Sequence, residues 1–150
     1  MADMLRVQRG ARPWAPAPGI GLGEVLHRHN IPLIGLVQQG GHTFLYACLI
    51  GEGDTANVWA YSRLETAEEA RLLGAEDDDF DAVVNELLSD RPLTLAIAFD
   101  WEIEESSVLD AGQEGFLTTA DRFLTRVMKR WERAHARADQ LEKNSELISC

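Results

Sequence analysis

The sequence predicts an α+β fold, with helices packed on a mostly antiparallel, four-stranded sheet. Residues 31–64 contain three runs rich in β-branched and aromatic residues, joined by short Gly-containing turns, which is typical of an antiparallel meander. Apolar residues alternate from residue 93 to residue 103, which predicts one more strand. Other segments carry apolar residues every three to four positions, which predicts helices. The expected order is α-βββ-αα-β-α, ending in a long C-terminal helix.

The 150 residues are expected to divide into an arm, one domain and a tail. Residues 1–21 form a Pro/Gly-rich N-terminal arm, residues 22–143 a single α+β domain and residues 144–150 a C-terminal tail. Proline fixes φ and lacks an N–H, so neither a helix nor a central strand is expected in the arm. In one interpretation Trp14 anchors the arm on a neighbouring chain. A flexible tail and an arm docked on its own domain are the alternatives.

The domain begins with a short helix and three strands. The helix spans residues 22–29 and ends at Asn30 and Pro32, because the residue before a proline avoids the helical region. The strands cover residues 31–38, 42–50 and 55–64, with turns at residues 39–41 and 51–54. Residues 42–50 are apolar on both alternating faces, so this strand is expected at the centre of the sheet.

Two helices and a strand follow. A capping-box pattern at residues 66–69 begins the first helix, and Gly74 ends it in a left-handed conformation. The second follows an acidic run at residues 76–79 and buries one face, formed by Phe80, Val83, Val84, Leu87 and Leu88. The strand turns one set of side chains to the core: Leu93, Leu95, Ile97, Phe99, Trp101 and Ile103. Residues 105–115 are expected as a loop, with a short strand at residues 107–109 as an alternative.

The last helix is expected from about Phe116 or Thr118 to Lys143. One apolar stripe runs along it, formed by Ala120, Phe123, Leu124, Val127, Met128, Trp131, Ala134, His135, Ala138 and Leu141. From Thr118 to Leu141 the helix spans about 36 Å, which is longer than a small sheet covers. We therefore expect the end of the stripe, with Trp131 and Leu141, to pack against another subunit.

The same helix carries a basic stripe. Arg122, Arg126, Arg130, Arg133 and Arg137 step by three or four residues, and Lys129 lies among them. Three interpretations stay open. The stripe pairs with acids of its own chain, such as Glu65, Glu68 and Glu69, or with those of a second copy. Alternatively it docks an acidic protein partner, or it contacts nucleic-acid phosphates.

Composition limits the class of protein. Asp plus Glu number 25 against 14 Lys plus Arg, and a formal net charge of −11 argues against nucleic acid as a partner. The longest apolar run, at residues 44–50, is too short to cross a membrane, and no secretory signal is expected. Two cysteines cannot form a disulfide scaffold. The expected location is the cytoplasm, and the excess of Arg over Lys is typical of a GC-rich bacterial genome.

No motif assigns a catalytic residue, a cofactor or a metal. His27, His29, His42 and His135 lack the spacing of a zinc site. The acidic run at residues 76–81 lacks the order of a calcium loop, and a favourable helix N-terminus is its simpler interpretation. The glycines at residues 19–23 follow a proline-rich segment and not a strand, so they do not match a nucleotide-binding loop. Cys48, within an apolar run, is expected to be inert.

These features predict a non-enzymatic, protein-binding accessory or adaptor subunit that self-associates. Its partner is a protein or a second copy of the chain. The predicted binding residues lie in the arm and the last helix: Trp14, Arg122, Arg126, Arg130, Trp131, Arg133, Arg137 and Leu141.

Three other functions are open. The expected element order resembles that of secretion chaperones and related chaperone-like domains, which implies binding of an extended client peptide. A small enzyme would use carboxylate acid/base chemistry at Asp100, Glu102 and Glu104, with His42 as a further candidate. An inhibitor that mimics DNA would present surface carboxylates at phosphate-like spacing.

Overall fold

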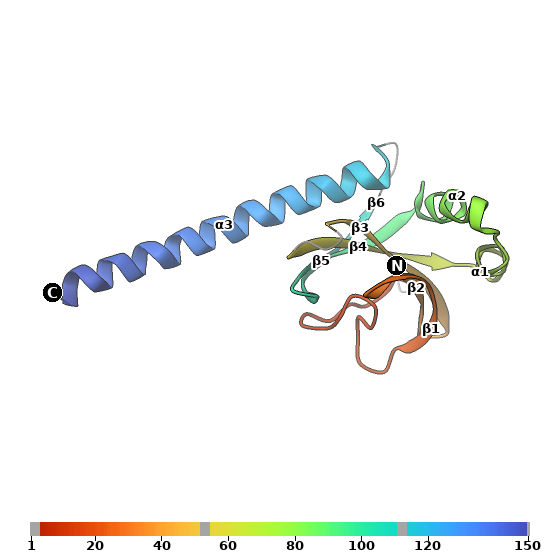
Figure 1. The fold of residues 1–150 in the computed structure, drawn as a ribbon, viewed down its shortest axis with the longest axis horizontal. Coiled ribbons are helices and arrows are strands. Elements are labelled where there is room, and N and C mark those ends of the chain that lie inside the picture. Colours follow the sequence, from red (N-terminus) through yellow and green to blue (C-terminus); the bar gives the residue numbers. More distant parts are fainter. Residues whose placement is uncertain (1–3, 52–54, 111–113, 150) are drawn as a thin grey trace.

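The computed structural model describes residues 4–51, 55–110 and 114–149, and the side chains of the last helix as far as residue 134. Its elements are β1 (Gly21–His29), β2 (Ile31–Gln39), β3 (His42–Ile50), β4 (Ala56–Leu64), α1 (Thr66–Leu73), α2 (Asp77–Leu88), β5 (Pro92–Phe99), β6 (Glu102–Asp110) and α3 (Phe116–Ser149). The strands form one antiparallel sheet in the order β1-β2-β3-β4-β5-β6 (Figure 1). The α+β class, the antiparallel sheet and the C-terminal helix are confirmed. The expected count of four strands is wrong, because the sheet has six.

The first added strand is β1, where a helix was expected at residues 22–29. Asn30 has φ 66°, so the chain reverses over one residue and His29 pairs with Ile31. Asn adopts this left-handed conformation more readily than most residues, which turns the expected helix stop into a hairpin turn. A Cβ on Gly23 would lie 2.9 Å from Leu36 Cβ, so the glycine permits close pairing of β1 with β2.

The second added strand is β6, which includes the end of the strand expected at residues 93–103 and part of the expected loop, where a short strand at residues 107–109 was the alternative. Asp100 and Trp101 have φ 53° and 65° and form a two-residue turn, so the expected strand at residues 93–103 is two strands. Ile103 pairs with Ala98 and therefore lies on the sheet face opposite Leu95. The apolar alternation in the sequence continued across a reversal of the chain.

The meander of β2, β3 and β4 is confirmed with small shifts in its ends. Residues 44–47 of β3 are buried, and the strand pairs with β2 and β4, as expected of a central strand. The turn expected at residues 51–54 includes residues 52–54, which lie outside the described part of the chain.

The helices differ from expectation at their ends. The N-cap of α1 is Glu65, one residue earlier than expected, and its N–H donates to Glu68 Oε1 at 2.9 Å. Gly74 ends α1 in the right-handed region, with φ −89°, and not in the left-handed conformation expected. α3 continues to Ser149 and not to about Lys143, so residues 144–149, expected in the tail, belong to the helix.

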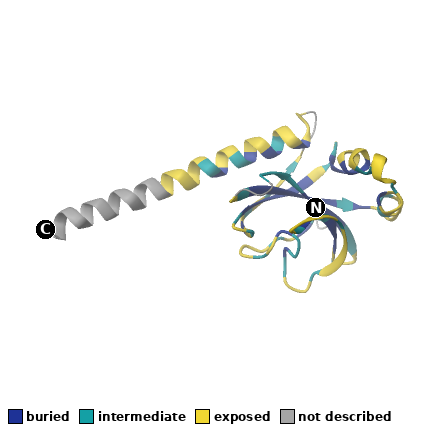
Figure 2. Ribbon diagram, viewed as in Figure 1, coloured by how far each residue is buried: buried dark blue, intermediate teal, exposed yellow. Residues whose placement is uncertain are grey.

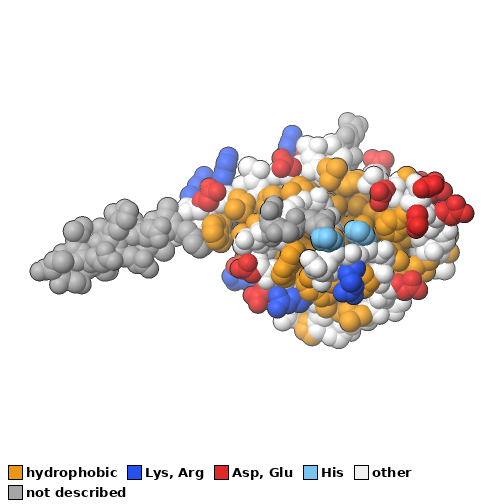
Figure 3. All heavy atoms as spheres, viewed as in Figure 1, with side chains coloured by type: hydrophobic (Ala, Val, Ile, Leu, Met, Phe, Trp, Pro, Cys, Tyr) orange, Lys and Arg blue, Asp and Glu red, His pale blue; other side chains and the backbone are white. Residues whose placement is uncertain are grey.

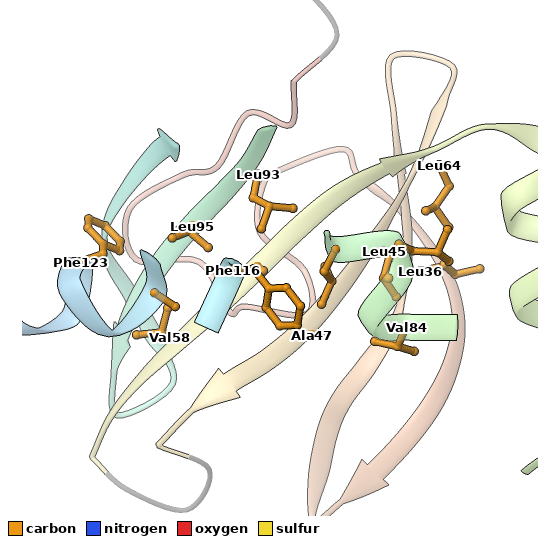
Figure 4. Close-up of a cluster of buried hydrophobic side chains, with 14 of the residues drawn as sticks. Leu36, Leu45, Ala47, Val58, Leu64, Val84, Leu93, Leu95, Phe116 and Phe123 are labelled. Carbon is orange, nitrogen blue, oxygen red and sulfur yellow. The ribbon is translucent and has the colours of Figure 1, made fainter. Parts of the chain in front are cut away.

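Both faces of the sheet are covered. The three helices cover one face, over a core that includes Leu45, Val58 and Leu95 (Figure 4). The other face carries Phe44, Tyr46, Trp59 and Tyr61 and is covered by the N-terminal arm. Figure 2 shows burial along the middle strands, whereas β1 is exposed almost throughout. The arm therefore covers one face of the sheet, and α1, α2 and α3 cover the other.

The arm lies along its own sheet from residue 4. Leu5, Pro13 and Pro16 are buried. Gly10 N donates to Ile103 O at 2.7 Å, and Ile103 N donates to Ala11 O at 2.9 Å. The Tyr61 hydroxyl donates to Pro13 O at 2.6 Å. These contacts match the alternative in which the arm docks on its own domain.

Candidate functional site

The first part of α3 packs through apolar side chains against the rest of the domain. We call that rest, the six-stranded sheet with α1 and α2, the body. Phe116, Ala120, Phe123 and Val127 are buried against the sheet, and their spacing of four, three and four residues places them on one helix face. Figure 4 shows Phe116 and Phe123 over the strands that carry Val58 and Leu95. Of the apolar stripe predicted for this helix, Phe123 and Val127 lie in the core and Leu124 packs against it, whereas Met128 is only partly buried.

Beyond the body, α3 continues as a helix through residues 131–149, which we call the outer segment (Figure 1). Among residues 116–134, Val127 is the last that is buried. Trp131 stacks on Phe99 of β5, with ring centroids 5.5 Å apart and an interplanar angle of 10°, and stays 39% exposed. The body therefore ends near Trp131 along this helix.

The apolar repeat in the sequence of α3 continues beyond the point where the helix leaves the body. From Ala120 onward the steps alternate between four and three residues, through Leu124, Val127, Trp131, Ala134, Ala138, Leu141, Ser145 and Ile148. All are apolar or small, and a 4-3 repeat marks the seam of a coiled coil. We call this set the seam. Its first part faces the sheet, and its second part falls in the outer segment.

The basic residues of α3 are partly paired within the chain. Arg122 Nε lies 2.8 Å from Glu114 Oε1, and Arg130 Nη2 lies 2.6 Å from Glu105 Oε1. The Arg126 guanidinium lies 5.6 Å from the centroid of the Phe123 ring. Figure 3 shows basic and acidic side chains together where α3 leaves the body. Two of the stripe's charges are thus neutralised locally.

Among the side chains that the structure describes, the acids expected to pair with the basic stripe, Glu65, Glu68 and Glu69, do not do so. Glu68 pairs with Arg91 and Glu65 with Arg63. Within the described part of the chain, Lys129 and Arg133 form no ion pair. The stripe therefore keeps net positive charge beside the start of the outer segment.

The other predicted binding residues fall in two places. Trp14 packs within its own chain, with its ring centroid 6.1 Å from that of Trp59 and 6.2 Å from that of Trp101. A role for Trp14 as an intermolecular anchor stays a prediction. The side chains of Arg137 and Leu141 lie outside the described residues.

A groove of about 410 Å³ at the β1–β2 edge was not predicted. It is lined mainly by apolar side chains, with one cation: Trp14, Leu22, Val25, Arg28, Asn30, Ile31, Pro32, Leu36 and Tyr46, together with Gly23. A Cβ on Gly35 would overlap the Tyr46 hydroxyl, so this glycine lets the tyrosine side chain lie across β2. Burial raises the pKa of Tyr46 to about 12, although Arg28 lowers it. Two exposed apolar residues, Leu22 and Val25, are the sequence signal, but they were assigned to a helix.

Two of the residues considered for acid/base chemistry, His42 and Asp100, lie near opposite ends of β4. Asp100 N donates to Thr55 O beside the start of β4, whereas His42 begins β3 near the other end of β4. Nine residues of strand span about 30 Å, so the fold does not bring His42 to Asp100.

The described residues were also considered for a metal site and for a membrane-spanning helix. Among the described residues, no three His, Cys, Asp or Glu side chains gather as metal ligands would. No helix in that part of the chain is long and apolar enough to cross a membrane.

Comparisons of this chain with protein-family models, with curated proteins and with solved structures found no match.

Proposed function

We propose that the chain is a non-enzymatic, protein-binding accessory subunit that self-associates through the outer segment of α3. One observation carries the proposal: α3 continues as a helix beyond Val127, the last buried residue among 116–134, while the seam continues in its sequence to Ile148. The helix and its apolar repeat therefore extend together past the body.

Elementary helix energetics support a partner for the outer segment. Short isolated helices are marginal in water, because helix formation gains most of its stability from packing an apolar face. The 19 positions of residues 131–149 are only a few more than the roughly 12–15 below which an isolated helix is marginal in water. Packing the seam against a second helix would cover the exposed Trp131 and the apolar positions that follow it in the sequence, and would supply this stability.

The proposal is tested by the mass of the full chain in sedimentation equilibrium. We expect a dimer, with twice the 16.7 kDa of one chain. Ala138→Glu places a charge in the seam and should shift the mass to that of a monomer. Ala136→Glu is the matched control, because position 136 lies on the opposite side of the heptad and the variant should remain dimeric. A monomeric wild-type chain at all concentrations contradicts the proposal.

The β1–β2 groove favours a second candidate function, the binding of an extended peptide as in chaperone-like domains. β1 is an edge strand with an unpaired outer side, and such an edge pairs with extended chains. Exposed Leu22 and Val25 offer apolar contacts beside that edge.

This second function is tested with an array of extended apolar peptides. Leu22→Glu should abolish binding, whereas Leu73→Glu, at an exposed leucine of α1, should leave it unchanged. Equal binding by the two variants contradicts a peptide site in the groove.

A further inference from the structure

We propose that two copies of the chain pair through their outer segments in antiparallel orientation, with Ala138 of one copy opposite Leu141 of the other. This inference rests on the proposed function and adds the orientation and the register of the pair. Three observations carry it: where the body covers the seam, how the seam is spaced, and how charge is distributed along α3.

The body of each copy blocks a parallel pair. Ala120 and Val127 belong to the seam and are 0% and 4% exposed, because their own sheet covers that face. In a parallel pair in register, residues 116–130 of the partner would lie along this same face, where the sheet already is. An antiparallel pair needs only the outer segment, which lies beyond the sheet (Figure 1).

The spacing of the seam then fixes the register. Antiparallel coiled coils place the two kinds of seam position opposite each other, and the pairs become Trp131 with Ile148, Ala134 with Ser145, and Ala138 with Leu141. A shift of one heptad toward longer overlap would bring Ile148 opposite Leu124, where the partner would meet the sheet. A shift the other way would shorten the overlap of the two outer segments. The register proposed is the longest that the body allows.

The distribution of charge favours the same orientation. Residues 122–137 contain six Lys or Arg and a single acid, Glu132. Residues 138–149 contain three acids, Asp139, Glu142 and Glu146, and one Lys. In an antiparallel pair the acidic end of each helix lies beside the basic region of the other, and Arg133 of one copy lies opposite Glu146 of its partner. A parallel pair would set like charge beside like charge over most of the helix.

Disulfide trapping tests the orientation. In a Cys150→Ser parent, Ala134→Cys and Ser145→Cys are made separately, oxidised alone and as an equimolar mixture, and analysed by intact mass. We expect disulfide-linked heterodimers in the mixture, at least tenfold above the parent, and no such increase for either variant alone. In the antiparallel pair two copies of residue 134 are separated by about 17 Å along the helix, beyond disulfide reach.

The same samples, reduced and sedimented, separate the two proposals. Monomeric chains overturn the proposed self-association and the orientation with it. Dimers in which each variant crosslinks with itself, or in which the mixture gives no heterodimer, overturn the antiparallel register alone.

Discussion

The N-terminal arm stabilises a strained turn at Asp100 and Trp101. Trp101 has φ 65°, a conformation that costs a residue with a side chain roughly 1–2 kcal/mol. Arg12 Nη1 donates to the carbonyl oxygens of Asp100 and Trp101 at 3.3 and 3.2 Å. The Trp101 ring packs edge-on to Trp59, with centroids 6.5 Å apart. Aromatic packing and the arm together hold a turn that the residue type disfavours.

Substitutions of Trp101 should therefore reverse the usual ranking of alanine and glycine in a sheet. Trp101→Ala and Trp101→Gly lose the same ring contacts, but only glycine relieves the backbone. We expect Trp101→Gly to be more stable than Trp101→Ala by about 1 kcal/mol in urea unfolding. Equal stability, or a more stable alanine variant, contradicts strain at this position.

The two buried tyrosines should make the folded protein less stable at alkaline pH. Burial raises the pKa of Tyr46 to about 12 and that of Tyr61 well above its usual value of 10.0. Because the folded protein holds the neutral phenols, their contribution is complete below pH 10 and falls as pH rises toward 12. Absorbance of tyrosinate should appear only with unfolding in this range, and Tyr46→Phe should shift the unfolding midpoint to higher pH. Ionisation of both tyrosines near pH 10 in a folded chain contradicts their burial.

At the scale of elements, α1 is attached to the sheet by a half-buried ion pair. Arg91 donates to Glu68 Oε2 at 2.7 Å and to Arg63 O at 3.3 Å, which joins the start of α1 to the end of β4 and the start of β5. The hydrogen bond from Arg91 lowers the pKa of Glu68 below 4.5. The stability from this pair is therefore present above pH 4.5 and is lost as pH falls through the lowered pKa.

Glu68→Gln should remove that acid dependence. We expect a loss of up to about 1 kcal/mol at pH 7 and a flatter fall in stability below pH 4.5. Glu69→Gln is the matched control, since Glu69 forms no ion pair among the described residues. Thermal unfolding from pH 3 to pH 7 measures both variants, and identical profiles contradict the role of the ion pair.

The sequence predicted correctly those elements in which the apolar pattern and the residues at the element's ends indicate the same structure. The meander of β2, β3 and β4 combines apolar runs with Gly-containing turns, and α2 combines an acidic first turn with one apolar face. β1 and β6 escaped prediction because Asn30, Asp100 and Trp101 reverse the chain without glycine. The β1–β2 groove was not predicted because β1 was not, since a strand that is exposed at almost every position carries no clear apolar alternation.

At the scale of the whole molecule, the sequence predicted a helix too long for its domain, but not where the body would end. That limit depends on how far β5 reaches along α3, where Phe99 meets Trp131, and only the assembled sheet determines it. The same limit separates the part of the seam that stabilises the fold from the part available to a partner. The basic stripe was predicted as a set, whereas its partial neutralisation by Glu105 and Glu114 depends on β6 and the chain before α3.

The most direct test of self-association through α3 is hydrogen exchange of the amides in residues 131–149, followed by mass spectrometry at several protein concentrations. If a second copy packs on the outer segment, these amides should exchange slowly at high concentration and faster on dilution, while amides of β3 and β4 stay protected throughout. Exchange of residues 131–149 at unprotected rates at every concentration, or protection that does not change with dilution, would contradict the account.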